Sequence, residues 1–323
     1  SDPSVLALAV IEAARDVGIR IVLLRTVYLR GDFDQEPAEH QKRFCDSSIS
    51  EAMQRIEDLR VAIEGLADLR VSMGVACHSV RAMAKEDIVS LKTTHGDLPF
   101  HLHVSEQRSE VLSCIDAYGM GPIAMLAQAG VLDGMATLVH GTHLEAGEAD
   151  LIARFASTVC VCPSTEADLG DGLIDASALY ERGVPLSLGT DDHTLSSILE
   201  EARRLEMHER LRQEARNTLT SAEGESSVAA AFKAATMGGA RSLNLSMGDL
   251  EVGLWADCVS YDLSDPCLAG CDDESLLGAL VFSADNRALR DVMVGGKWVV
   301  KDGVHPMAER THQEYLRICG SLF

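Results

Sequence analysis

The sequence predicts an α/β protein built as a (β/α)8 TIM barrel, and three observations support this prediction. First, six apolar segments with the length of strands alternate with helical patterns, which indicates parallel strands joined by right-handed crossovers. Second, unusual polar residues lie at the carboxyl ends of several different strands, where a barrel assembles its site. Third, the glycine-rich phosphate loop that is typical of an open doubly wound sheet is missing. The predicted strands are Ile19–Leu29, Leu69–Cys77, Pro99–Ser105, Met135–His140, Ser157–Cys162 and Pro185–Asp191, and the last two helices of the pattern are Leu195–Gln213 and Ser226–Leu243.

Helix and loop patterns fill the space between these strands. The first helix is expected to have Asp2 as its cap and Pro3 in its first turn, and to end at Gly18. A long polar loop, 30–47, follows the first strand, and loops of this length often carry function or close over a site. Apolar residues at helical spacing define the expected buried stripes: Leu6, Val10, Ala13 and Val17 in the first helix, and Ala52, Ile56, Leu59, Ile63 and Leu66 in the second.

The last eighty or so residues change character. The segments Gly248–Gly253 and Val292–Val300 have the pattern of short strands beside glycine turns, which indicates a small β appendage on the barrel. We therefore expect two units, a barrel domain over 1–245 and a β-sandwich segment with a C-terminal helix over 246–323.

Composition and charge narrow the classes of protein. With 46% apolar and 24% charged residues the composition is that of a globular protein, and no uncharged apolar run approaches the roughly 18 residues of a membrane span. The net charge of −22 argues against nucleic acid and anionic membranes as partners. No secretory signal is visible, and nine cysteines without a regular framework fit a reducing compartment. We therefore expect a soluble, cytoplasmic protein that acts on a small molecule.

The pairs Cys160-x-Cys162 and Cys267-x-x-x-Cys271 lack a matching second pair, so they are interpreted as buried small side chains.

Polar side chains at three strand ends carry the candidate chemistry. His103 and Glu106 end the third predicted strand, His140 ends the fourth, and Asp191 ends the sixth. Imidazole and carboxylate groups bind divalent cations and move protons near neutral pH. Together they predict a hydrolytic metal site, in which the metal lowers the pKa of a bound water to about 7 and a carboxylate removes its proton.

Each of these residues also has a structural alternative. Asp191 could cap the helix that follows it. His140 could bond a backbone carbonyl, and the pair His101-x-His103 could be structural. The convergence of three strand ends favours the metal site.

The same residues resemble motifs of the amidohydrolase superfamily, in its aminohydrolase branch. The motifs are His103-x-x-Glu106, His140 within Val139–His143, and Asp191 within Gly189–His193, in the order of the family's fifth, sixth and eighth strands. The tail segments 248–262 and 294–299 are similar to the family's returning β-sandwich. Within the branch, the run Cys162–Gly172, the turn Ser79–Arg81 after His78, and the run 103–107 are most similar to the formimidoylglutamate deiminase family.

This resemblance implies a hydrolase that converts N-formimino-L-glutamate to N-formyl-L-glutamate and ammonia in histidine degradation. It implies one Zn²⁺ per subunit, or another divalent metal such as Fe²⁺, with His103 and Asp191 as ligands. Asp191 would also be the general base, His140 would polarise the substrate and hold the attacking water, and Glu106 would carry the proton that lets ammonia leave. The expected assembly is a homodimer.

His78 and Arg81 are the implied substrate-binding residues. An arginine can hold a glutamate carboxylate with two parallel hydrogen bonds. A surface ion pair is an equal interpretation of Arg81 when the resemblance is set aside.

One departure from the family pattern is serious. The family takes two further zinc ligands from a His-x-His at the end of its first strand, and only six strands can be counted here before the tail. We therefore expect strands one and two and their ligands to be absent from this chain. Two alternatives stay open: a related zinc aminohydrolase that acts on a purine or another amidine, and a non-catalytic truncated barrel.

Overall fold

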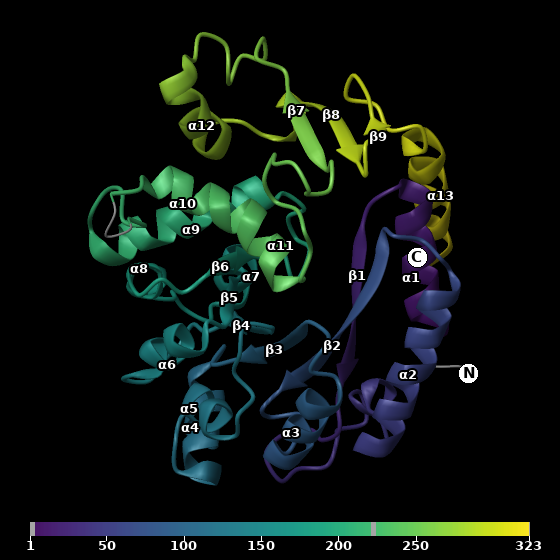
Figure 1. The fold of residues 1–323 in the computed structure, drawn as a ribbon, viewed down its shortest axis with the longest axis vertical. Coiled ribbons are helices and arrows are strands. Elements are labelled where there is room, and N and C mark those ends of the chain that lie inside the picture. Colours follow the sequence, from purple (N-terminus) through teal and green to yellow (C-terminus); the bar gives the residue numbers. More distant parts are fainter. Residues whose placement is uncertain (1–3, 221–223, 323) are drawn as a thin grey trace.

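A curved sheet of six parallel strands forms the centre of the molecule (Figure 1). The structure is a computed structural model that describes residues 4–220 and 224–322. The strands follow one another in the sheet in chain order, each parallel to the next. This is the order of a (β/α) barrel, so the parallel α/β part of the prediction is confirmed. The strands are β1 (Ile21–Val27), β2 (Val71–Ser79), β3 (Phe100–Val104), β4 (Ala136–His140), β5 (Thr158–Val161) and β6 (Leu186–Leu188).

Helices cover the outer side of this sheet. In Figure 1, α2, α3, α4, α6, α8 and α10 succeed one another around the strands. The helices are α1 (Val5–Val17), α2 (Ile49–Gly65), α3 (Lys85–Thr94), α4 (Arg108–Tyr118), α5 (Pro122–Gln128), α6 (Glu148–Phe155), α7 (Pro163–Leu169), α8 (Ala176–Glu181), α9 (Ile198–Gln213), α10 (Ser227–Lys233), α11 (Gly239–Ser242), α12 (Asp273–Phe282) and α13 (Ala308–Leu322). The 3₁₀ helices are η1 (Lys42–Phe44) and η3 (Asn286–Ala288), and η2 (Ala234–Gly238) is a π-helix between α10 and α11.

The main core lies between the sheet and these helices. The alternate residues Phe100, Leu102 and Val104 of β3 are buried in it. The predicted stripe of α2 packs against the same core through Ala52, Ile56, Leu59 and Ile63. The period of 3.6 residues thus placed this helix correctly.

The first helix and the first strand differ from their predicted burial. In α1 the stripe of Leu6, Val10, Ala13 and Val17 faces outward, and Leu6 is 79% exposed. The buried residues are Ile11 and Ala14, and Gly18 ends the helix in the left-handed conformation as predicted. The proposed cap, Asp2 and Pro3, lies outside the described residues.

β1 was expected to be buried on both faces, yet only Val27 is fully buried. The reason is its position, because β1 pairs with β2 alone and forms an edge of the sheet. β6 is shorter than predicted. It ends at Leu188, so Asp191 lies in the loop that follows rather than in the strand.

The tail forms a three-stranded antiparallel sheet of β7 (Cys258–Tyr261), β8 (Leu289–Val294) and β9 (Lys297–Val300). The prediction for Val292–Val300 is confirmed as the β8–β9 hairpin. The strand predicted at Gly248–Gly253 is wrong, because this segment is a loop in which Leu250 and Val252 are exposed and pair with no strand. The salt bridge from Arg20 to Asp257 ties this sheet to the start of β1.

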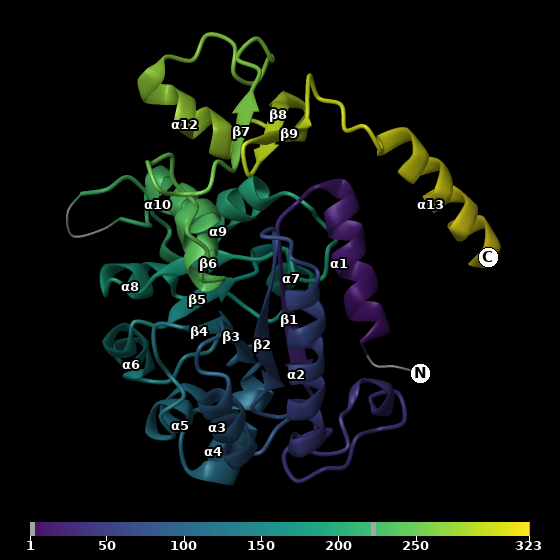
Figure 2. The ribbon, with the colours of Figure 1, turned by 45° about the vertical axis from the view of Figure 1, so that its right-hand side comes forward.

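The last helix, α13, extends away from the rest of the chain (Figure 2). Among the described residues, no helix is both long enough and apolar enough to cross a membrane.

Candidate active site

The carboxyl ends of neighbouring strands place the predicted site residues side by side. In the register of the sheet, Ser79 of β2 pairs with His103 of β3, and Val104 of β3 pairs with His140 of β4. Three histidines from three strands therefore meet at one edge of the sheet, as a parallel barrel requires.

The three imidazole rings form a row. His78 and His103 meet edge to face with ring centres 5.2 Å apart, and His103 stacks on His140 at 5.5 Å. His103 Nδ1 donates a hydrogen bond to the backbone carbonyl of His78 at 2.8 Å. This bond leaves Nε2 of His103 unprotonated when the ring is neutral, which is the arrangement of a histidine that ligates a metal.

Burial keeps the first two imidazoles neutral. It lowers the pKa of His78 to about 4, with the neighbouring His103 and Arg81 adding to the effect. Burial also lowers the pKa of His103. Neutral imidazole is the form that a metal ion binds.

His140 stands in the opposite environment, among three carboxylates. Its Nδ1 lies 3.3 Å from Glu166, and its Nε2 lies 3.9 Å from Glu106 and 3.8 Å from Asp191. Burial alone would lower the pKa of His140, but the hydrogen bond to Glu166 and the surrounding negative charges outweigh it and raise that pKa. His140 does not bond a backbone carbonyl by its side chain, so this alternative is wrong.

Glu106 and Arg81 lie together beside this row. Arg81 Nη2 is 3.6 Å from Glu106, and its Nε is 3.7 Å from Glu110. Burial raises the pKa of Glu106. With 29% of its side chain exposed, Arg81 faces the site instead of forming a surface ion pair.

Glu110 was not predicted from the sequence, where it reads as a solvated residue of a helix. It is fully buried in the first turn of α4, and one of its oxygens accepts a hydrogen bond from the backbone of Ser105 at 2.9 Å. Burial raises its pKa to about 7. Glu110 thus connects Arg81 to the backbone next to Glu106.

Asp191 lies at the mouth of the site with 32% of its side chain exposed. It does not cap the next helix, because α9 begins at Ile198 with Ser197 as its cap. A carboxylate oxygen of Asp191, a ring nitrogen of His140 and Sγ of Cys162 lie within 4.8 Å of one another. Cys162, interpreted from the sequence as a buried small side chain, therefore borders the site.

These donors suit a divalent metal ion. Two imidazoles and a carboxylate are ligands of zinc-like cations, and the tautomer of His103 is already fixed for ligation. Among the described residues, the ligand atoms that lie close enough together to hold a metal are those of His140, Cys162 and Asp191, and His103 stacks on His140 beside them.

His101 contributes to the core instead. Its Nε2 lies 2.8 Å from the backbone carbonyl of Ser242, so the structural alternative holds for this histidine of the pair and not for His103.

Comparison with known proteins adds independent findings. The family model of the amidohydrolase family matches residues 3–299. Formimidoylglutamate deiminase of Pseudomonas aeruginosa is 36% identical, across 100% of this chain and 71% of that protein. The structure of an amidohydrolase from Brucella melitensis is 31% identical with a TM-score of 0.87, over 96% of this chain and 68% of the other. An adenosine deaminase from Xanthomonas campestris, solved with bound zinc, shares the fold at 23% identity with a TM-score of 0.80, over 95% of this chain and 66% of the other.

Proposed function

The chain belongs to the amidohydrolase family, as a hydrolase of carbon–nitrogen bonds, and from this premise we propose that it deiminates N-formimino-L-glutamate. The products would be N-formyl-L-glutamate and ammonia, and the reaction would belong to histidine degradation. The observation that carries the proposal is the 36% identity to a formimidoylglutamate deiminase across the whole of this chain. The geometry supports it, because Arg81 lies beside Glu106 as a cation that can hold a substrate carboxylate.

The site residues divide the work of this reaction. His103 and Asp191 would hold the zinc, which would lower the pKa of the attacking water. Asp191 would take a proton from the water as the water oxygen bonds to the imino carbon and the C=N double bond opens toward nitrogen. His140 would polarise the substrate and hold the attacking water. Glu106 would carry protons from the water to that nitrogen, so that the carbon–nitrogen bond breaks and ammonia leaves.

His78 and Arg81 would bind the part of the substrate that does not react. The guanidinium of Arg81 lies between two carboxylates, with Nη2 3.6 Å from Glu106 and Nε 3.7 Å from Glu110. A carboxylate that reaches Arg81 would also compete with Glu106 for the guanidinium group, which would leave Glu106 free for proton transfer.

We also propose that β1 to β6 correspond to strands three to eight of a closed barrel, over a domain of residues 1–245. A closed barrel needs two more strands, and the family's other His-x-His ligand pair lies on one of them. The three-stranded tail sheet would be part of a β-sandwich in the unit 246–323. In the cell we propose a cytoplasmic homodimer that binds neither nucleic acid nor membranes.

Parallel assays of ammonia release test the function. N-formimino-L-glutamate and a set of ring substrates, such as adenosine, would be supplied to the zinc-loaded protein. Release from N-formimino-L-glutamate supports the proposal, whereas release only from a purine would favour the related aminohydrolase. If neither is hydrolysed, but a longer chain that carries the His-x-His strand is active, the deiminase assignment holds for the complete site.

A further inference from the structure

Glu166 is a buried carboxylate for which the proposed reaction has no role. It lies in the first turn of α7 and is 2% exposed. Its Oε1 accepts a hydrogen bond from the backbone of Cys162 at 2.9 Å and lies 3.3 Å from Nδ1 of His140. A buried carboxylate costs free energy unless it is hydrogen-bonded, and a helix cap alone does not require a charge. The second contact, to His140, is the one that calls for an explanation.

The backbone of His140 indicates that the direction of this side chain is held by its surroundings. His140 has φ of 74°, in the left-handed region that residues other than glycine rarely adopt. Such strain persists only where the surrounding structure over-determines the conformation, and it is concentrated at functional sites. Glu166 is the hydrogen-bond partner of the ring in this conformation.

The two residues before Glu166 also make hydrogen bonds that fix the position of this turn. Oγ1 of Thr165 accepts a hydrogen bond from the backbone of Asp192 at 3.1 Å, next to Asp191. The backbone of Ser164 donates to Glu201 of α9 at 2.9 Å, which anchors the turn in the core. The turn Ser164–Glu166 therefore contacts both His140 and the loop that bears Asp191.

We propose that Glu166 is a positioning residue that holds His140 with Nδ1 protonated and Nε2 directed toward Glu106 and Asp191. In the neutral ring, a proton on Nδ1 leaves Nε2 as the nitrogen that can accept a hydrogen bond from a water molecule in the site. The Glu166 carboxylate is the acceptor that keeps this proton on Nδ1. The same division of roles operates in the Ser-His-Asp triad, where the buried carboxylate orients the histidine.

This inference rests on the role of His140 in the proposed function, so its test needs a readout that does not require turnover. The full chain would be labelled with ¹⁵N-histidine and studied by long-range ¹H–¹⁵N NMR at a pH where His140 is neutral. The His140 signals would be assigned by their loss in His140→Gln. We expect the Nδ1-protonated tautomer in the wild type and a mixture of tautomers in Glu166→Met, which removes the acceptor.

Two further variants separate positioning from structural support. Glu166→Gln keeps an acceptor oxygen for both Cys162 and His140, so it should retain the tautomer. Glu201→Gln disturbs the anchor of the same turn without touching His140, so it should retain the tautomer as well. Retention in both variants together with loss in Glu166→Met supports the proposal. An Nε2-protonated wild type, or an unchanged tautomer in Glu166→Met, would overturn it.

Kinetics give a second readout where the protein turns over its substrate. Glu166→Met should lower kcat by about a hundredfold or more and change KM by less than about threefold, because the lost interaction positions His140 to hold the attacking water in the chemical step. Glu166→Gln should recover much of that loss. Equal losses in Glu166→Met and Glu201→Gln would show that the turn acts only through stability and would contradict the proposal. If N-formimino-L-glutamate is not hydrolysed at all, the tautomer experiment still decides the role of Glu166.

Discussion

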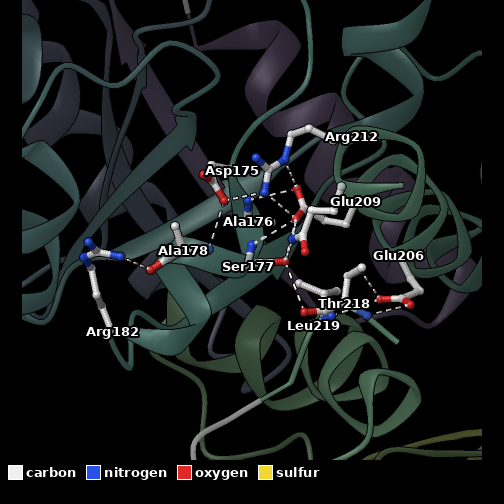
Figure 3. A network of polar contacts seen from close by, with 11 residues as sticks. Asp175, Ala176, Ser177, Ala178, Arg182, Glu206, Glu209, Arg212, Thr218 and Leu219 are labelled. Atoms are coloured by element: carbon white, nitrogen blue, oxygen red, sulfur yellow. Dashed lines mark hydrogen bonds and ion pairs between the residues drawn. The ribbon is translucent and has the colours of Figure 1, made fainter. Parts of the chain in front are cut away.

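Glu209 offers the most direct test of how buried carboxylates on α9 hold the loops around the site. It is 1% exposed and accepts hydrogen bonds from the start of α8, namely the backbone of Ala176 at 3.2 Å, that of Ser177 at 3.3 Å, and the Ser177 hydroxyl (Figure 3). The guanidinium of Arg212 donates to it at 2.9 Å, and so does the side-chain amide of Gln213. The substitution Glu209→Ala removes the acceptor for all of these groups.

The expected loss of stability follows from the buried hydrogen-bond donors that the substitution leaves without an acceptor. A buried donor without a partner costs about 1–3 kcal/mol, and removing one member of a buried ion pair costs about 3–5 kcal/mol. These costs are not additive, and Arg212 keeps Asp175 as a second partner at 2.5 Å. We therefore expect Glu209→Ala to lower the free energy of unfolding by about 3–5 kcal/mol.

Equilibrium unfolding in urea measures this loss. The control is Glu12→Ala on α1, which removes an exposed carboxylate and should change stability by less than about 0.5 kcal/mol. Burial by itself would raise the pKa of Glu209, but the hydrogen bonds from Arg212, Ser177 and Gln213 outweigh it and lower that pKa. The stabilisation is therefore present above the ordinary carboxyl pKa and is lost as the pH falls below it, so the deficit of the variant should shrink in acid. A loss below about 1 kcal/mol at pH 7 would refute the reasoning.

Three more predictions concern packing, charge and metal. Gly238→Ala places a Cβ 1.9 Å from a backbone oxygen of β6, so it should destabilise the protein by about 1–3 kcal/mol or more. Gly278→Ala is the control, because the space around Gly278 is open and the substitution should not destabilise the protein. Thermal unfolding compares the two variants. Glu110→Gln should gain stability relative to the wild type as the pH rises from 4.5 to about 7, by up to about 3 kcal/mol, because ionising this buried carboxyl is unfavourable only in the folded state. Urea titrations at pH 5 and pH 8 measure the difference in unfolding free energy between the two proteins. An equal difference at both pH values would contradict the prediction. Zinc should raise the unfolding temperature of the wild type but not of the double variant His103→Ala, Asp191→Asn; an equal shift in both would place the metal elsewhere.

The spacing of apolar residues predicted correctly the burial of a helix that has a single apolar face. The stripe of α2 was correct because one side of that helix faces the core along its whole length. The stripe of α1 was wrong because the helix packs through Ile11 and Ala14, and spacing alone does not tell which of two apolar faces meets the sheet. The same limit explains β1, whose apolar residues indicate a strand but not that it lies at an edge.

The burial of charged residues was harder to predict from the sequence than the elements themselves. Glu110, Glu166, Glu201 and Glu209 are buried, although glutamate is rarely buried in general. Glu201 and Glu209 accept hydrogen bonds from backbone groups of another segment, a partnership that has no signature along the chain. Glu110 and Glu166 accept theirs from backbone groups five and four residues earlier, at the starts of their own helices. Glu166 lies in the run Cys162–Gly172, which resembles the formimidoylglutamate deiminase family, and this resemblance was the sequence signal that pointed to it.

The sequence by itself determined the alternation of strands and helices, and with it the end of the sheet at which His103, His140 and Asp191 must lie. This follows from short-range physics, since side-chain period and turn residues specify each element locally. Only the tertiary structure decided which groups face one another, such as Glu166 and His140, or Glu110 and Arg81. Their separations of 26 and 29 positions are closed by the sheet register and by helix packing, and these long-range contacts set the burial and the electrostatic environment of each site residue.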